Sequence, residues 1–227
     1  MCNNLTNKKI NMEESVKQEM ESLLEGRNEQ QQKAIKYFFQ YKGCIFGHLM
    51  TDQEYEQMVM DIIKSTDWKK KALSKIGVEE EDVQEVQPIH FEGYDYAPKS
   101  SLSLFGKDNK WRSSHYQLSW IFCSGTEVYV WQYTFSTIDD TKKERTEEYF
   151  YKDITNFSTV TETIEKKVPI KTSCSGGTTF GLKNVDDKQF SIIVPGDRLN
   201  CQMEDETNAL EVSIQGLKAK LREKKNS

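Results

Sequence analysis

The sequence predicts an α+β protein, in which an N-terminal helical region is followed by an antiparallel β domain that ends in a helix. Three patterns predict this class. Apolar residues recur at helical spacing between residues 12 and 77. Over residues 113–160, apolar and aromatic residues alternate with polar ones, which is typical of strands that bury one face. Near the end of the chain, one narrow apolar stripe follows a helix and consists of Leu210, Ile214, Leu217 and Leu221.

Three or four helices are expected in the first part of the chain, the first two over residues 12–25 and 28–41. Thr51 and Glu54 have the spacing of a capping box, in which each side chain accepts a hydrogen bond from the other residue's backbone N–H. A helix should therefore begin after Thr51. Gly77 follows the last short helix at the position where a left-handed cap is common. Because short helices are marginally stable alone, their apolar faces must pack on one another or on the β domain.

A charged and then polar connector follows the helices. Residues 79–85 contain a run of acidic side chains. Consecutive carboxylates on a helix do not share a face, so we interpret this run as a solvated helical turn rather than as a metal site. Residues 86–96 should be extended, with breaks at Pro88 and Gly93, and residues 97–110 should form a polar loop.

Four consecutive strands are expected in the central stretch, at residues 116–123, 127–137, 144–151 and 154–160. Ser124 and Gly125 give a tight turn signal, so the first two strands should form a hairpin. The aromatic residues of the second strand share one face and are Tyr129, Trp131, Tyr133 and Phe135. Three further short strands are expected at residues 164–170, 178–182 and 190–194, with turns at 175–177, 184–188 and 195–197.

Seven short strands followed by one amphipathic helix is the order of elements in the pleckstrin-homology-like (PH-like) fold. Residues 113–224 resemble the bacterial PH-like domains. The segment from Tyr149 to Ile154 (YFYKDI) is similar to the middle of such domains. The pattern of Phe190, Ile192 and Val194, followed by a Pro-Gly turn and a helix, is similar to their end. The resemblance implies a seven-stranded antiparallel barrel or sandwich, with the C-terminal helix capping one open end.

The chain departs from the lipid-binding eukaryotic PH domains in two ways. Its first hairpin loop, residues 123–126, carries no positive charge, and its C-terminal helix has no tryptophan. Both departures argue against phosphoinositide binding, and the fold alone does not assign a function. The expected division of the chain is a disordered tail over 1–11, a helical region over 12–86, a connector over 87–112 and the PH-like domain with its helix over 113–227.

Composition disfavours several classes of function. The net charge is −5, which argues against nucleic acid as a partner. The first residues lack the apolar stretch of a secretory signal, and no apolar run approaches the roughly 20 residues of a membrane-spanning helix. The five cysteines are far apart, with no CxxC pair, which is typical of reduced thiols in a cytoplasmic protein.

No residues with recognisable chemistry for catalysis, metal binding or cofactor binding are predicted. His48, His90 and His115 lack the spacing of metal ligands, and the chain contains no phosphate-binding loop or hydrolase motif. Cys123 and Cys174 have no histidine beside them in the sequence, so they are interpreted as inert thiols. We therefore expect no enzyme activity and no cofactor.

Two groups of residues are candidates for a ligand or partner surface. Basic residues surround a tryptophan in the connector, as they do in nucleic-acid and headgroup sites. The aromatic face of the second strand is expected in the core, or around a cavity if the helix leaves the barrel unfilled. The candidate residues are Lys107, Lys110, Trp111, Arg112, Tyr129, Trp131 and Tyr133.

The first functional hypothesis is a non-enzymatic cytoplasmic module that binds a protein partner of unknown identity. The second is a peripheral binder of anionic lipid or of another small ligand, which would use the connector bases and the basic end of the last helix. The third is an enzyme without a recognisable motif. The sequence does not identify the partner, the ligand or the oligomeric state.

Overall fold

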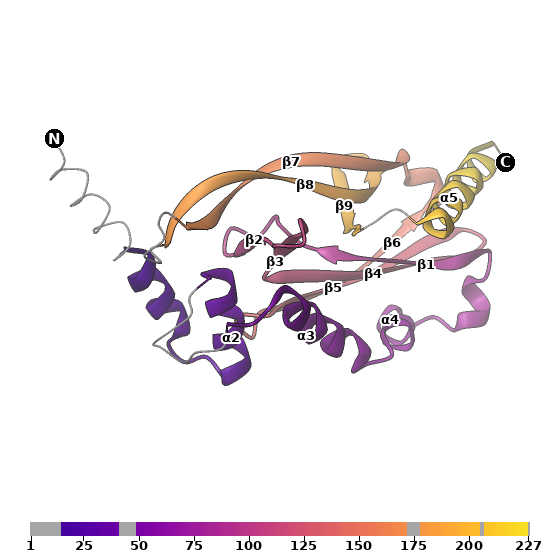
Figure 1. The fold of residues 1–227 in the computed structure, drawn as a ribbon. Coiled ribbons are helices and arrows are strands. Elements are labelled where there is room, and N and C mark those ends of the chain that lie inside the picture. Colours follow the sequence, from indigo (N-terminus) through magenta and orange to yellow (C-terminus); the bar gives the residue numbers. More distant parts are fainter. Residues whose placement is uncertain (1–14, 41–48, 172–177, 205–206, 227) are drawn as a thin grey trace, which may run out of the picture.

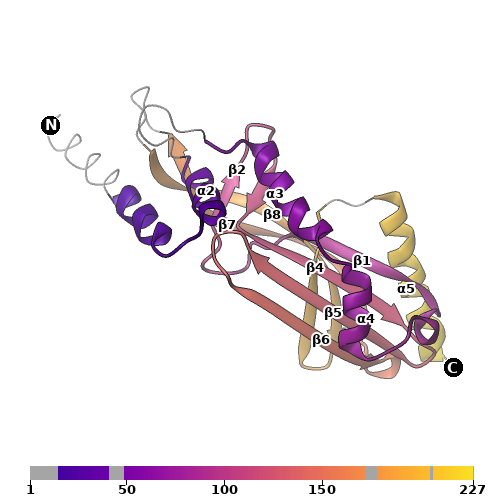
Figure 2. The same ribbon diagram turned by 90° about the horizontal axis from the view of Figure 1, so that it is seen from below.

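The computed structural model describes residues 15–40, 49–171, 178–204 and 207–226. These residues form three layers, which are the N-terminal helices, a four-stranded sheet and, on its opposite side, a three-stranded sheet (Figure 1 and Figure 2). The predicted α+β class, the antiparallel pairing and the helices toward both ends are confirmed. The predicted tail over residues 1–11 and the turn at 175–177 lie outside the described residues.

Helices cover one face of the four-stranded sheet. Residues 15–24 are helical, and three helices follow them, α2 (Glu29–Phe38), α3 (Asp52–Lys64) and α4 (Trp68–Ile76). The predicted capping box is present: Thr51 N–H donates to Glu54 Oε2 at 2.7 Å, and Glu54 N–H donates to Thr51 Oγ1 at 3.2 Å. Gly77 ends α4 in the left-handed region, with a φ of 82°. The acidic run forms a short 3₁₀ turn, Glu80–Val83.

The four-stranded sheet has the order β1-β4-β5-β6, and every neighbouring pair is antiparallel. Its strands are β1 (Val86–Tyr94), β4 (His115–Cys123), β5 (Glu127–Ser136) and β6 (Lys142–Phe150). The predicted break at Gly93 is wrong, because β1 continues through it in regular register. At Pro88 the strand continues but is irregular, with a shift in register between Val86 and Ile89. Gly93 allows another segment to approach closely, since a Cβ there would lie 3.1 Å from Glu204 N.

The predicted polar loop over residues 97–110 contains a strand. This strand, β2 (Ser103–Phe105), pairs with β3 (Trp111–Ser113) in a small two-stranded sheet. The chain reverses between them because Asn109 adopts a φ of 63° and Gly106 N–H donates to Lys110 O at 2.8 Å. Asparagine tolerates this left-handed conformation better than most residues do, which makes the tight turn possible.

Both faces of β4 and β5 are largely buried, although the alternating pattern predicted one buried face. The larger side chains of β4 and β5 face the helices and include Tyr116, Leu118, Phe122, Trp131, Tyr133 and Phe135. We call the opposite face the inner face. Its apolar residues belong to a second core and include Ile121, Cys123, Val128 and Val130. The sheet is therefore the middle layer of the protein.

The three-stranded sheet differs most from the prediction. Its strands are β7 (Asn156–Lys171), β8 (Thr178–Val194) and β9 (Asp197–Gln202). The short strands expected at 154–160 and 164–170 are one strand, as are those expected at 178–182 and 190–194. The predicted turn at 184–188 is wrong because these residues pair with β7, which satisfies their backbone groups. The turn at 195–197 ends β8 as expected, but the chain then returns as β9, which the sequence pattern missed.

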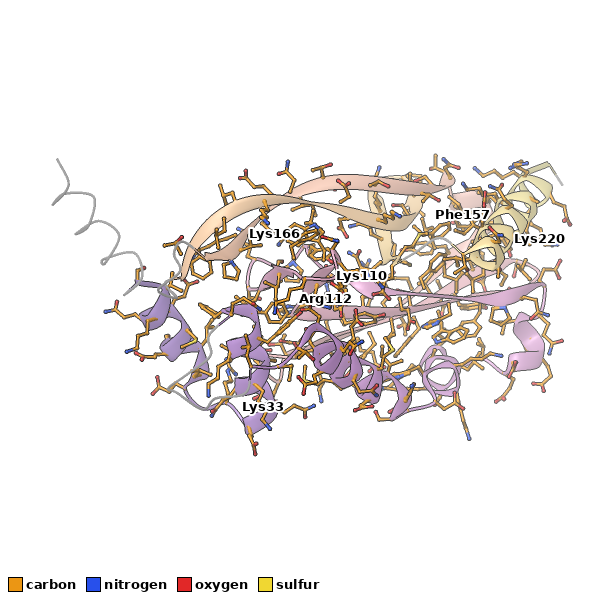
Figure 3. The ribbon with its side chains drawn as sticks, viewed as in Figure 1. Lys33, Lys110, Arg112, Phe157, Lys166 and Lys220 are labelled. Atoms are coloured by element: carbon orange, nitrogen blue, oxygen red, sulfur yellow. The ribbon has the colours of Figure 1, made fainter. Side chains whose placement is uncertain are left out.

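The prediction was a seven-stranded barrel or sandwich, and the described strands form three separate sheets that do not close into a barrel. After β6 the chain passes through a 3₁₀ turn, Tyr151–Asp153, and β7 then pairs with β8 instead of extending the first sheet. The last helix, α5 (Asn208–Asn226), packs at the end where the two larger sheets meet (Figure 1). Its apolar stripe is confirmed: Ile214, Leu217 and Leu221 are buried, and Leu210 is half-buried. Figure 3 shows Phe157, from the start of β7, beside this helix.

Candidate functional site

The inner face is apolar beneath α5 and polar toward its other end. The polar end lines a cleft of about 420 Å³, together with the loop that follows β1. Pockets for small molecules commonly have volumes of about 300–1,000 Å³. The polar residues whose chemistry defines this cleft are Asp95, His115, Gln117, Gln132, Thr134, Lys143 and Arg145. We refer to this site as the inner cleft.

Strand geometry brings the floor of the inner cleft together. Alternate residues of a strand point to the same face, so β4, β5 and β6 each place two floor residues on the inner face. Gln117 of β4 lies opposite Thr134 of β5, and Thr134 lies opposite Lys143 of β6. The three side chains therefore form a row across the sheet, which runs from half-buried positions to an exposed one at Lys143.

Two glutamines fix the floor in place. The Gln132 side chain is 7% exposed, and its Nε2 donates to Asn200 O at 2.8 Å and to Ser119 Oγ at 3.2 Å. Gln117 Oε1 accepts a hydrogen bond from Gln202 N–H at 2.9 Å. These bonds join β4 and β5 to β9. The amides are therefore oriented by the protein itself, which lowers the entropy cost of binding a ligand against them.

A buried carboxyl group lies at the deep end of the inner cleft. Asp95 is 8% exposed, and its Oδ1 accepts a hydrogen bond from Ala97 N–H at 3.0 Å and lies 3.4 Å from Gln202 Nε2. Burial raises the pKa of Asp95 above its ordinary value, whereas the Ala97 N–H and the nearby charges of Lys166 and Lys143 lower it. Carboxyl groups with perturbed pKa values in a cleft are characteristic of functional sites.

A second carboxyl group lies behind the first. Asp187 of β8 is 1% exposed, and its Oδ2 accepts a hydrogen bond from Gln189 Nε2 at 2.5 Å. Burial and the charge of Asp95 raise the pKa of Asp187 to about 6, although the hydrogen bond from Gln189 opposes them. Lys166 donates to Ser101 Oγ at 3.1 Å, and Figure 3 shows it on the β7–β8 hairpin. Burial lowers the pKa of Lys166, while the charges of the two aspartates raise it.

The Asp187→Asn variant should be more stable than the wild type at neutral pH. The pKa of Asp187 is raised on folding, so the folded chain holds its proton more tightly than the unfolded chain between about pH 4 and 6. Wild-type stability should fall as the pH rises through this window, and the variant should escape that loss. At pH 7 we expect a gain of about 1–3 kcal/mol in the free energy of unfolding, measured by urea titration.

The matched control for this change is Asp186→Asn. Asp186 is exposed and accepts a hydrogen bond from Thr163 Oγ1 at 2.8 Å. Removing its charge should alter the free energy of unfolding by less than about 0.5 kcal/mol throughout the range from pH 4 to pH 7, as is usual for surface substitutions. Equal stability profiles for Asp187→Asn and the wild type between pH 4 and 7 would refute a buried charge at Asp187.

The inner cleft contains acid and base groups, but the serine hydroxyl beside His115 and two described thiols are not accessible as nucleophiles. His115 Nδ1 lies 3.1 Å from Ser114 Oγ, and burial lowers the pKa of His115. However, Ser114 is fully buried, and its Oγ accepts the backbone N–H of Leu102 at 2.9 Å. Burial also raises the pKa of Cys123 to about 11 and that of Cys201 to about 12, which keeps both thiols protonated at neutral pH. Among the described residues, no three His, Cys, Asp or Glu side chains gather as a set of metal ligands.

Positive charge lies at the shallow end of the inner cleft. Lys143 is exposed and forms no ion pair with any described residue. Arg145 is half-buried, and its guanidinium binds Glu147 at 2.6 Å and lies 3.6 Å from Asp197. The cleft therefore presents a cationic group near solvent, amides and a hydroxyl along its floor, and a carboxyl group at its deep end.

The predicted connector residues do not line the inner cleft. Arg112 is fully buried between the helices and the sheets, where its guanidinium binds Asp108 and Glu56 (Figure 3). Lys110 and Trp111 border a separate cavity of about 550 Å³. Lys107 lies near the start of α3, and its backbone N–H donates to Asp52 Oδ2 at 2.9 Å. The structure thus separates residues that stand together in the sequence.

The predicted aromatic residues lie on the opposite face of the sheet from the inner cleft. Trp131 is fully buried, and its ring centroid lies 6.0 Å from that of Trp68 of α4. Tyr133 stacks on Trp68 at 4.8 Å, and Lys71 Nζ lies 4.6 Å from the Tyr133 ring. Tyr129 OH donates to Glu127 Oε2 at 2.5 Å. The helix α4 therefore covers the part of the aromatic face that includes Trp131 and Tyr133.

The sequence patterns missed the residues of the inner cleft. Gln117, Gln132 and Thr134 alternate with the aromatic residues of β4 and β5, so they would ordinarily face solvent. The sequence did contain one signal for this site: two glutamines on adjacent strands have side chains on the same face of the sheet. Their burial depends on β9 and on the loop after β1, which no local pattern predicts.

Comparison with known proteins finds no matching family model, no matching curated protein and no matching solved structure. None of the helices in the described part of the chain combines the length and the apolar character that crossing a membrane requires. The site must therefore be interpreted from its own geometry and chemistry.

Proposed function

We propose that this chain is a non-enzymatic binding protein, and that its inner cleft holds a small polar ligand with an anionic group. One observation carries the proposal: buried, pre-oriented polar groups converge on a cleft of about 420 Å³ that also contains the carboxyl group of Asp95. Hydrogen bonds within the protein already orient Gln117, Gln132 and Asp95. A ligand that binds against them therefore loses little free energy to ordering the site.

The order of groups along the cleft supports one class of ligand. A carboxylate or phosphate would sit at the shallow end, beside the exposed ammonium of Lys143. The body of the ligand would lie against the Gln117 amide and the Thr134 hydroxyl. A hydrogen-bond donor, such as an amine or hydroxyl group, would face Asp95. A hydroxy acid, an amino acid or a sugar phosphate has this sequence of groups.

Binding rather than catalysis is proposed because the serine beside His115 and the two buried thiols are not available as nucleophiles. The hydroxyl of Ser114 is buried and accepts a hydrogen bond from the backbone. Burial raises the pKa of Cys123 and of Cys201, which keeps both thiols protonated at neutral pH. A cytoplasmic location and kinship with the bacterial PH-like domains remain proposals that rest on the sequence pattern. In such a fold the ligand would occupy the space between the sheets rather than the first hairpin loop.

Thermal shift measurements with a panel of small carboxylates and phosphate monoesters should identify compounds that raise the melting temperature. The affinity of the best compound, measured by calorimetry, should fall about tenfold or more in Lys143→Ala. Lys142→Ala is the matched control, because Lys142 is the neighbouring exposed base on the opposite face of β6. Its affinity should remain within about twofold of the wild type.

Two results would refute this function. One is a panel in which neither carboxylates nor phosphates stabilise the protein. The other is a compound that binds equally well to Lys143→Ala, to Lys142→Ala and to the wild type. A response to carboxylates alone, or to phosphates alone, would identify which anionic group the cleft prefers.

A further inference from the structure

β6 is an edge strand. Among the described residues it pairs with β5 alone, and Figure 2 shows it at the outer margin of the sheet. Its pairing with β5 is regular from Lys142 to Phe150, without a bulge. A regular edge of this length presents a row of backbone N–H and C=O groups that another strand can bind.

The outward-pointing backbone groups belong to the even-numbered residues of β6. At the two ends of the ladder, Ser136 N–H donates to Thr141 O at 3.0 Å, and Tyr151 N–H donates to Thr126 O at 3.2 Å. Hydrogen-bonded pairs alternate along an antiparallel ladder, so the odd-numbered residues of β6 bond to β5. The residues with outward backbone groups are therefore Lys142, Glu144, Thr146, Glu148 and Phe150.

Two basic side chains begin β6, and two adjacent acidic side chains stand in its second half. Lys142 and Lys143 stand in the first half, and Glu147 and Glu148 stand in the second. When two antiparallel copies of β6 are aligned about Arg145, Lys142 faces Glu148 and Lys143 faces Glu147. Oppositely charged side chains directly across a strand pair attract each other. Twofold symmetry makes each of these pairs occur twice.

This register also fits the backbone. It places Lys142 opposite Glu148 and Glu144 opposite Thr146, all four of which have outward-pointing N–H and C=O groups. Neighbouring registers with compatible backbones bring like charges together. Centring the pair on Thr146 sets Glu144 against Glu148, and centring it on Glu144 sets Lys143 against Arg145.

We infer that two copies of this chain associate by pairing β6 with β6, antiparallel and centred on Arg145, so that one sheet runs through both copies. The contact is isologous, because the same strand serves on both sides of the twofold axis. At this axis, Arg145 of one copy faces Arg145 of the other. Its charge is compensated, because its guanidinium binds Glu147 at 2.6 Å and lies 3.6 Å from Asp197.

Sedimentation velocity of the full chain over a range of micromolar concentrations tests this interface. The wild type should show a monomer–dimer equilibrium that weakens as salt rises, because exposed charge pairs are screened. Lys142→Glu and Glu148→Lys should each raise the dissociation constant about tenfold or more, since each reversal creates two like-charge pairs. The double variant Lys142→Glu/Glu148→Lys should restore the constant to within a few-fold.

Both positions are exposed and lie outside the inner cleft, so the variants should fold and keep the binding of the small ligand. The interface does not rest on that binding, and either proposal could fail while the other stands. A wild type that stays monomeric throughout the concentration range would overturn the inference. So would a double variant that dimerises no better than the single ones, because complementary charge would then not define the contact.

Discussion

Replacing Arg112 with alanine is expected to lower the free energy of unfolding by about 3–5 kcal/mol, a large part of the stability of a typical domain. The Arg112 side chain is fully buried. Its Nη1 donates to Asp108 Oδ1 at 2.9 Å, its Nη2 donates to Asp108 Oδ2 at 2.5 Å, and Nη2 also binds Glu56. Truncation would leave a void between α3 and the β2–β3 hairpin, and two carboxylates without their shared cation. Urea titration at pH 7 measures the loss.

Repeating the urea titration at acidic pH tests whether the ion pair between Arg112 and Asp108 causes this loss of stability. The hydrogen bonds from Arg112 lower the pKa of Asp108 to about 2. The stabilisation from this ionised group is therefore present above the ordinary pKa of aspartate, near 3.8, and is lost as the pH falls toward 2. The stability difference between the wild type and Arg112→Ala should shrink over that window.

Arg112→Lys should recover only part of the loss, because an ammonium cannot bind a carboxylate through a planar fork. A loss below about 1 kcal/mol in Arg112→Ala would contradict a structural role for this ion pair.

Replacing Trp131 with alanine is expected to cost about 3–5 kcal/mol, the range for large aromatic residues in protein cores. Trp131 is fully buried, packs near Trp68, and donates from Nε1 to Glu144 Oε1 at 2.9 Å. Glu144 in turn lies 3.7 Å from Lys71 Nζ and 3.6 Å from Lys75 Nζ, both on α4. The substitution should therefore loosen α4 from the sheet as well as create a void.

Amide hydrogen exchange separates these two consequences. In Trp131→Ala, protection should fall most strongly in α4, whereas Trp131→Phe should keep most of the packing and lose only the bond to Glu144. Leu182→Ala serves as a control on an exposed apolar side chain, since Leu182 is 63% exposed and should contribute little. If Trp131→Ala cost no more than this control, Trp131 would not be part of the packed core.

Local signals were sufficient to predict several elements. The Thr51–Glu54 capping box, the alternation in β4 and β5 and the stripe along α5 all reflect periodicities that a backbone imposes on its own side chains. These predictions hold because each depends on a few neighbouring residues. The pattern divides each of the long strands β7 and β8 in two, and in β8 the polar residues 184–188 favour a turn. Pairing with the facing strand overrides that preference, since it satisfies the backbone regardless of the side chains.

The candidate site depended on contacts that no local pattern contains. Arg112 stands beside Trp111 and near other bases in the sequence, which favoured an exposed basic patch. One of its two carboxylate partners, Glu56, comes from α3, far away in the chain. The Gln132 side chain is buried because β9 lies over it, and β9 itself was not predicted. The chemistry of the inner cleft therefore arises from the way the layers assemble.

The two proposals meet at β6. Lys143 lines the inner cleft and also stands on the strand inferred to pair with a second copy. Pairing about Arg145 would set the shallow ends of two inner clefts on either side of the twofold axis. Lys143 would then lie near Glu147 of the second copy as well as near the anionic ligand.

Backbone NMR shift mapping locates the small anionic ligand that the inner cleft is proposed to bind. The best compound from the panel would be titrated into isotope-labelled protein. Shift changes should be concentrated at residues 95–100, at Gln117 and at Thr134, which surround the cleft. Changes concentrated instead at Lys107–Arg112 or around Tyr129, Trp131 and Tyr133, with the cleft residues unmoved, would contradict binding in the inner cleft.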